Sequence, residues 1–282
     1  MPYRGIYESV VNMMVEVMPS GSTDVTSRAR VWRCLERASR IVDEYCGRHF
    51  YPLTATRYYD GYDIDGDDSL KIWVDDLLSV TALTVDYDGD GVFEETLVEN
   101  TDFRLWPYND DVWPKLALVL DTYNGQYSYW PGAGRAIKCS GVFGYGDGSS
   151  ASPYVATGGT VTVANGTTLT LTLAGMTIER GQLLLVEAEQ MYAGDDNLLV
   201  ARAVNGTTGI AHAAKAAYVA QFPPAVSEAC LRLAARAFAR KSTPFALAGP
   251  DQFGHSTIIP GDDPDISRAL APFRRAPNLR AV

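Results

Sequence analysis

The first long apolar repeat along the chain has helical spacing. From residue 25 to residue 45, apolar side chains recur every three or four positions, at Val31, Cys34, Leu35, Ala38, Ile41, Val42 and Tyr45. This period places them on one face of an α-helix that a core would cover. Asp24 has the residue type of an N-cap, and Gly47 has that of a C-terminal glycine. The pattern therefore predicts a helix that begins after Asp24 and ends before Gly47.

The following region, residues 48–145, has the pattern of strands and turns. Thr, Val, Tyr and Phe are frequent there, and Gly and Asp interrupt them at short intervals. Two stretches, KLALVLDTY and AIKCSGVFGYG, predict strands in its second half.

Residues 152–221 have a different composition and read as a second β region. The stretch TVTVANGTTLTLTL alternates β-forming residues around Asn165-Gly166, which predicts a hairpin. Asn205-Gly206 repeats the same turn chemistry. Because helical patterns flank all the β segments, we predict a small all-β domain inserted in a loop, where such additions are tolerated.

Helical spacing returns in PPAVSEACLRLAARAFARK, where a narrow polar stripe is formed by Glu228, Arg232, Arg236 and Arg240. The rest of this helix is apolar, so its own core or a partner must surround it, and we expect it to pack on the first helix. A short helix is predicted in DPDISRALAPF, within a Gly- and Pro-rich tail that resembles an arm.

These elements predict an α+β fold with three parts. Residues 1–151 and 222–261 form a core in which a small α-helical bundle is joined to a β-hairpin and strand region. Residues 152–221 form the inserted all-β domain, and residues 262–282 form a C-terminal arm.

Charge is distributed unevenly along the 282 residues, whose net charge is −10. Residues 60–121 contain 17 acidic residues against Lys71, Arg104 and Lys115, a net charge of −14, whereas four arginines and no acid follow Ile266. A mostly acidic chain binds nucleic acid poorly because phosphates are repelled. Such a chain is suited to line a passage that DNA crosses without adhering.

Four arginines of the first helix, Arg30, Arg33, Arg37 and Arg40, lie largely on a face other than the apolar one. A solvated polar face is the simpler interpretation of this stripe. A surface that docks an acidic neighbour is the alternative.

The stretch DYDGDGVFEETL has carboxylates at Asp86, Asp88 and Asp90 and a glycine at Gly91, as the start of an EF-hand loop does. Its twelfth position is Leu97 instead of the bidentate glutamate, and a strand pattern precedes it where the EF-hand has a helix. We predict a hairpin tip whose Asp and Gly residues serve turn geometry. Weak cation binding is the alternative.

Catalytic and cofactor motifs are missing from the sequence. It has no Walker loop, no G-x-S-x-G and no metal-ligand spacing among its three histidines and four cysteines. No apolar run approaches the ~20 residues of a membrane helix. We therefore expect no enzymatic activity, no cofactor, no resident metal and no membrane partner.

The order of several phrases resembles the head–tail connector (adaptor) family of tailed bacteriophages. The phrases are GRHFYPLTATRYYDGY, LKIWVDDLLSVTALTVDYDGDG, TDFRLWPYN, KCSGVFGYG and PPAVSEACLRLAARAFAR. The matching positions are Arg48, Phe50, Pro52, Leu70, Asp76 to Thr81, Phe103, Leu105, Pro107, Gly141, Phe143, Gly144 and Tyr145. The resemblance covers roughly residues 20–148 and 222–275, and the inserted β domain is a departure from the family pattern.

The resemblance implies a structural virion protein of the neck, assembled in the host cytoplasm. Copies of the chain would form a ring, usually twelve-fold, between the portal and the stopper or tail, with DNA as passing cargo in an axial channel. Candidate interface residues are Arg33, Arg37 and Arg40 on the first helix, and Leu270, Phe273, Arg274 and Arg275 on an arm expected to dock into the portal. A stopper or tail-completion protein, a module that recognises glycans or the host surface through the inserted domain, and an enzyme with a dispersed site are the alternatives.

Overall fold

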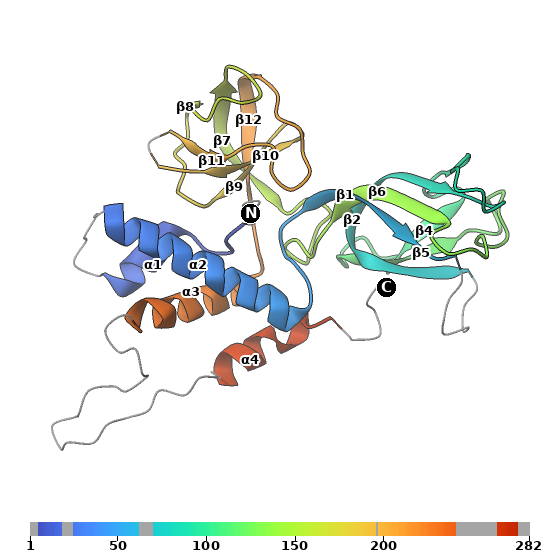
Figure 1. Ribbon diagram of the computed structural model, residues 1–282, viewed down its shortest axis with the longest axis horizontal. Coiled ribbons are helices and arrows are strands. Elements are labelled where there is room, and N and C mark those ends of the chain that lie inside the picture. Colours follow the sequence, from blue (N-terminus) through green and yellow to red (C-terminus); the bar gives the residue numbers. More distant parts are fainter. Residues whose placement is uncertain (1–4, 19–24, 62–69, 196, 241–263, 276–282) are drawn as a thin grey trace. The chain divides into compact units, whose positions relative to one another are not determined.

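The computed structural model describes residues 5–18, 25–61, 70–195, 197–240 and 264–275 (Figure 1). Its described part contains four α-helices and two antiparallel β-sheets, so the predicted α+β class with an inserted all-β domain is confirmed. Among these residues, no helix has the length and apolar character needed to cross a bilayer.

The helices are α1 (Val10–Val17), α2 (Val25–Cys46), α3 (Pro224–Ala239) and α4 (Pro264–Leu270), which continues into the 3-10 turn η1 (Ala271–Phe273). The predicted first helix is confirmed as α2. Gly47 follows it with a φ of +66°, the left-handed conformation that glycine adopts at a helix end. The predicted N-cap, Asp24, lies outside the described residues.

The prediction that α3 packs on α2 is confirmed, and Figure 1 shows α1, α2 and α3 side by side. Their shared core consists of Ile6, Val10, Met13, Val31, Trp32, Leu35, Ala38 and Ala234. The predicted short helix is confirmed as α4, and the Tyr45 hydroxyl of α2 donates to the Ser267 carbonyl of α4 at 3.1 Å.

The first sheet contains β1 (Leu53–Tyr59), β2 (Lys71–Val85), β3 (Glu95–Leu97), β4 (Phe103–Trp106), β5 (Lys115–Leu120) and β6 (Ile137–Phe143). Its order is β1-β6-β2-β5-β4, and β3 pairs with β2. The two strands predicted from KLALVLDTY and AIKCSGVFGYG are confirmed as β5 and β6. Alternate residues of β6 face the core, as the period of a strand with one covered face requires.

The second sheet contains β7 (Tyr154–Val163), β8 (Thr172–Ala174), β9 (Leu183–Val186), β10 (Glu189–Ala193), β11 (Leu199–Ala201) and β12 (His212–Ala220). Its order is β11-β10-β9-β12-β7-β8, and it curls into a half-barrel (Figure 1). The predicted hairpin is confirmed because β7 pairs antiparallel with β8. The Asn165 carboxamide holds the turn by accepting from the amides of Thr167 and Thr168.

Contacts divide the chain into two compact units. One contains Met1–Gly47 and Tyr154–Arg274, and the other contains Arg48–Pro153 and Arg275–Val282. This division differs from the expected domains, which grouped the helices with the first sheet. The curled sheet instead belongs to the same unit as the helices: Arg28 of α2 pairs with Asp195 at 3.3 Å, and the Arg180 guanidinium lies 5.4 Å from the centre of the Trp32 ring.

Candidate partner interface

A groove of about 540 Å³ lies between α2 and α3. It is lined by Ser27, Arg30, Arg33, Cys34, Arg37, Ala237 and Phe238, and we call it the arginine groove. The three arginines are spaced three and four residues apart, which places them on one side of α2. Helical periodicity alone thus gathers three guanidinium groups along one edge of an apolar floor.

Arg30 is fixed in the wall of the groove. Its Nη2 donates to the Phe238 carbonyl at 3.1 Å, and its guanidinium lies 4.8 Å from the centre of the Phe238 ring. This contact closes the end of the floor made by α3. A planar guanidinium stacked on an aromatic ring keeps the edge donors that it does not use available to an incoming acceptor.

Arg33 and Arg37 are exposed and lie one helical turn apart on the rim. Within the described part of the chain, neither side chain forms an ion pair with a carboxylate; Arg33 makes only a 3.4 Å contact with the Ala29 carbonyl. Exposed guanidiniums beside an apolar floor suit a partner that combines carboxylates with an apolar side chain. The structure therefore brings two of the three predicted helix residues together.

Arg40 does not belong to this groove. Its Nη2 donates to the Gly5 carbonyl at 2.7 Å and lies 3.3 Å from the Asp43 carboxylate, and its guanidinium lies over the Tyr7 ring. These contacts hold the segment before α1 against α2. The sequence placed Arg40 with Arg33 and Arg37 because the three share a spacing, but Arg40 serves the chain's own packing.

The four residues predicted to dock from the arm also make contacts within the chain. Leu270, the last residue of α4, is 2% exposed, and Phe273 is half-buried. Arg274 lies 5.3 Å from the centre of the Tyr45 ring. Arg275 donates to the Asp75 carboxylate at 2.6 Å and to the Val74 carbonyl at 3.0 Å. In this structure residues 264–275 are thus folded onto the chain, whereas the rest of the expected arm lies outside the described residues.

The predicted hairpin tip is confirmed between β2 and β3, which pair antiparallel up to Val85 and Glu95. We call residues 86–95 the acidic tip. Asp86 accepts from the Gly89 amide at 2.7 Å and from the Gly91 amide at 2.9 Å, which holds the turn from inside. Both glycines have positive φ, +78° and +89°, so the turn needs residues that tolerate this conformation.

Four carboxylates converge at the acidic tip. One oxygen from each of Asp86, Asp88, Asp90 and Glu94 lies within 4.8 Å of the others, a spacing at which a cation could be held. Glu94 was not among the residues predicted from the sequence, although it stands at the ninth position of the loop, where an EF-hand also has a ligand. The tip carboxylates already accept backbone hydrogen bonds, including one from the Val92 amide to Asp90 at 2.7 Å.

Asp86→Ala is expected to lower the melting temperature of the chain, whereas Asp88→Ala is expected to change it little. Burial raises the pKa of Asp86, but hydrogen bonds from the Gly91 and Gly89 amides outweigh this and hold the pKa below its ordinary value. The stabilisation is therefore present above the ordinary pKa of aspartate and is lost as the pH falls through the lower folded value. Circular dichroism melts at neutral and acidic pH measure both effects.

Calcium titration tests the alternative at the same tip. Because backbone amides satisfy Asp86, we expect Ca²⁺ to shift neither the melting temperature nor the fluorescence of the tyrosines. A calcium-dependent rise in melting temperature that Asp88→Ala and Asp90→Ala abolish would contradict this expectation.

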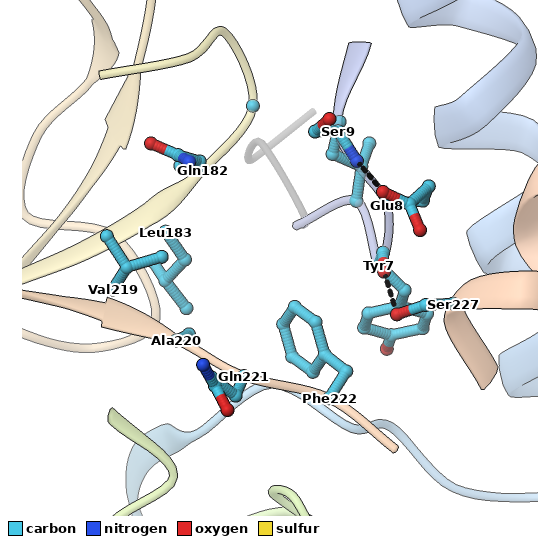
Figure 2. A pocket seen from close by; sticks show the side chains of 12 residues that line it. Tyr7, Glu8, Ser9, Gln182, Leu183, Val219, Ala220, Gln221, Phe222 and Ser227 are labelled. Atoms are coloured by element: carbon cyan, nitrogen blue, oxygen red, sulfur yellow. Dashed lines mark hydrogen bonds between the residues drawn. The ribbon is translucent and has the colours of Figure 1, made fainter. Parts of the chain in front are cut away.

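A second cavity, of about 220 Å³, lies where the segment before α1 meets the second sheet and the start of α3 (Figure 2). Its polar groups hold its walls: Glu8 accepts from the Ser9 amide at 2.7 Å, and the Ser227 hydroxyl donates to the Tyr7 carbonyl at 2.7 Å. The Tyr7 and Phe222 rings meet edge to face 4.8 Å apart. The cavity is smaller than common ligand pockets, and its contacts hold the chain's own segments together.

Sequence reasoning found Arg33 and Arg37 but not the floor of the arginine groove. Phe238 and Ala237 come from α3. The apolar surface of this helix predicted that most of it is buried, but not which of its residues remain accessible. The sequence signal for this floor was Phe238, an aromatic residue near the end of that helix.

Comparisons of the chain with protein-family models, with curated proteins and with solved structures find no match in any of the three.

Proposed function

We propose that this chain is a structural virion protein, a head–tail connector (adaptor) whose copies form a ring between the portal and the stopper or tail. The ring would leave an axial channel through which DNA passes as cargo. It would act in the neck of the virion by surface fit among copies and partners, without covalent chemistry.

The observation that supports this proposal most is a cluster of the residues that carry the family resemblance. Arg48 Nε lies 3.4 Å from the Asp76 carboxylate, and the Arg48 guanidinium lies 5.0 Å from the centre of the Tyr145 ring. That ring in turn meets Phe50 edge to face at 5.4 Å. Residues from three separate phrases of the sequence thus meet at one place.

Backbone hydrogen bonds tie the same phrases together. The Gly144 amide donates to the Asp76 carbonyl at 2.8 Å, and the Tyr145 amide donates to the His49 carbonyl at 3.0 Å. Burial raises the pKa of Asp76, while Arg48 opposes that effect, so the pair is a partly buried structural contact. The contacts among these phrases therefore support a common architecture.

Charge supports the ring and the channel. The excess of 14 negative charges in residues 60–121, which include strands of the first sheet, disfavours adhesion of DNA to this part of the chain. The arginine groove, in the other unit, gives the chain a positively charged surface. Head-to-tail contacts in a ring require two complementary surfaces on one chain.

The test is reconstitution with a portal protein found in the same genome. Negative-stain imaging and native mass spectrometry of the two purified proteins are expected to show a ring of this chain on the portal, twelve-fold where the portal is. A chain that remains a monomer beside an assembled portal would refute the proposal, and sugar binding by that monomer would favour the recognition module.

The role of α4 in portal docking is tested better by a point change than by deleting the arm, because deletion would uncover the site that Leu270 fills. Arg268 is 82% exposed on α4. We expect Arg268→Glu to weaken portal binding while leaving the melting temperature unchanged.

A further inference from the structure

We propose that the arginine groove of one copy receives the acidic tip of a second copy. This inference rests on the proposed function, because it names the contact that would repeat around the ring. It joins two surfaces that belong to different compact units of the chain.

The groove supplies cations around an apolar floor. Arg33 and Arg37 stand exposed on the rim, and Cys34, Ala237 and Phe238 are only partly covered beneath them. Burying this floor while leaving the guanidiniums without acceptors would be unfavourable. A suitable occupant therefore presents an apolar side chain flanked by carboxylates.

The acidic tip has this composition. Val92 is 55% exposed at the middle of the turn, and Asp88, Asp90 and Glu94 surround it in the sequence with exposed carboxylates. Within the described part of the chain, no lysine or arginine forms an ion pair with these three acids. The tip is also a rigid projection, because Asp86 and two glycines fix its backbone before any partner arrives.

The two surfaces match in charge. Three guanidiniums line the groove, and three exposed carboxylates surround Val92 at the tip. Carboxylates form paired hydrogen bonds with guanidinium edges, which adds direction to the attraction. The apolar floor gives Val92 a site in which its exposed surface leaves water.

A second copy fits the groove better than nucleic acid does. Phosphates would also pair with arginines, but the chain's net charge of −10 repels a polyanion, whereas one short tip brings its few carboxylates without a long charged backbone. A contact between two different patches of identical chains is heterologous, so it generates a closed ring when the rotation between copies closes.

Two variants of the full-length chain test this contact. The groove variant carries Arg33→Glu and Arg37→Glu, and the tip variant carries Asp88→Asn and Asp90→Asn, which keeps the side-chain oxygen that each backbone amide uses. All four side chains are exposed, so both variants are expected to melt as the wild type does. Arg268→Glu is the control for a charge change outside the groove.

Sedimentation velocity at low ionic strength, in the presence of a chelator, measures self-association. The wild type and the Arg268→Glu control are expected to assemble, and high ionic strength is expected to dissociate them. Each variant alone is expected to associate on the order of 100-fold more weakly, about tenfold for each of two lost charge pairs. An equimolar mixture of both variants is expected to stop at a dimer, because only the tip variant's groove and the groove variant's tip remain matched.

Three results would overturn the inference: a wild type that stays monomeric at every concentration, variants that assemble as the wild type does, or a mixture that forms no dimer. If the groove and tip variants still form rings on the portal, this contact is wrong and the connector function stands. If the wild type self-associates through these surfaces but forms no ring with the portal, the contact stands and the connector function fails.

Discussion

Arg202→Ala is expected to destabilise the second sheet by about 3–5 kcal/mol, because it leaves the buried Glu189 carboxylate without its guanidinium partner. The side chains of Arg202 and Glu189 are 4% and 0% exposed. Two hydrogen bonds join them, from Nη2 to Oε2 at 2.6 Å and from Nε to Oε1 at 2.9 Å. The pair is therefore bidentate and removed from water, the arrangement in which loss of one partner costs most.

This pair is the centre of a network that joins β10 to β12 and to two turns. Glu189 also accepts from the Ile210 and Ala203 amides, and it lies 2.9 Å from His212 Nε2. Arg202 donates to the carbonyls of Asn165 and Ile210. Both carbonyl contacts are exposed, so water can replace the guanidinium there, and the main loss falls on the buried carboxylate.

The acidity of Glu189 gives the same network a pH dependence. Burial raises its pKa, but hydrogen bonds from Arg202 and the Ile210 amide, together with those from His212 and Ala203, outweigh it and hold the pKa below the ordinary value. The stabilisation is present above the ordinary pKa of glutamate and is lost as the pH falls through the lower folded value. In Arg202→Ala most of this favourable contribution is expected to be absent already at neutral pH.

Hydrogen–deuterium exchange of peptides covering β9 to β12 is the measurement, because it reports on this sheet independently of the first. Lys215→Ala is the matched control: its Nζ lies 2.8 Å from Glu187 on the same sheet, but both side chains are exposed, so little change is expected. If the amides of β9 to β12 are equally protected from exchange in Arg202→Ala and Lys215→Ala, the expected large stabilisation by the buried pair is wrong.

The helices and the buried pair Arg202–Glu189 show where prediction from the sequence succeeds and where it fails. The period of α2 and the apolar girth of α3 were sufficient to predict both helices and their mutual packing, because amphipathicity is a local property. Arg202 and Glu189 carry no such local signal: Arg202 stands in the otherwise apolar stretch LLVARAV and Glu189 in the mixed stretch VEAEQM, so neither position indicates a buried ion pair. Their burial follows from the curl of the sheet, which depends on how six strands pair.

The candidate interface divides in the same way. Spacing identified Arg33, Arg37 and Arg40 together, and only the path of the segment before α1 separates Arg40 from the others. Leu270 and Arg275 looked like parts of a free arm because Gly and Pro precede them. The burial of Leu270 and the pairing of Arg275 with Asp75, 200 positions away along the chain, could not be found from local pattern.

Gly141→Ala is expected to destabilise the first sheet by about 3 kcal/mol, at the upper end of what overpacking costs. Gly141 lies in β6, opposite Ala55 of β1 and Val80 of β2. A Cβ at this position would stand 2.1 Å from the Ser79 carbonyl oxygen and 3.3 Å from the Val80 Cα. Both obstacles are backbone atoms, so no side-chain rotation can relieve the clash.

The register of β2 explains why a glycine is required there. Its pairing with β6 shifts between Leu77 and Ser79 and again between Val80 and Ala82, so the backbone of β2 bends toward β6 at this point. Gly141 belongs to the phrase that resembles the connector family. Its place in that phrase therefore follows from a close approach of two strands.

Urea unfolding followed by tryptophan fluorescence measures the effect, because Trp73 lies in β2 and Trp130 is buried in the core of the same sheet. Gly132→Ala is the matched control, since a Cβ at Gly132 would meet nothing within 4 Å. If Gly141→Ala unfolds at the same urea concentration as Gly132→Ala, the two strands can separate at little cost. The glycine of the family-like phrase would then need an explanation other than the approach of β2 to β6, and the convergence of these phrases would lose part of its weight as support for a connector.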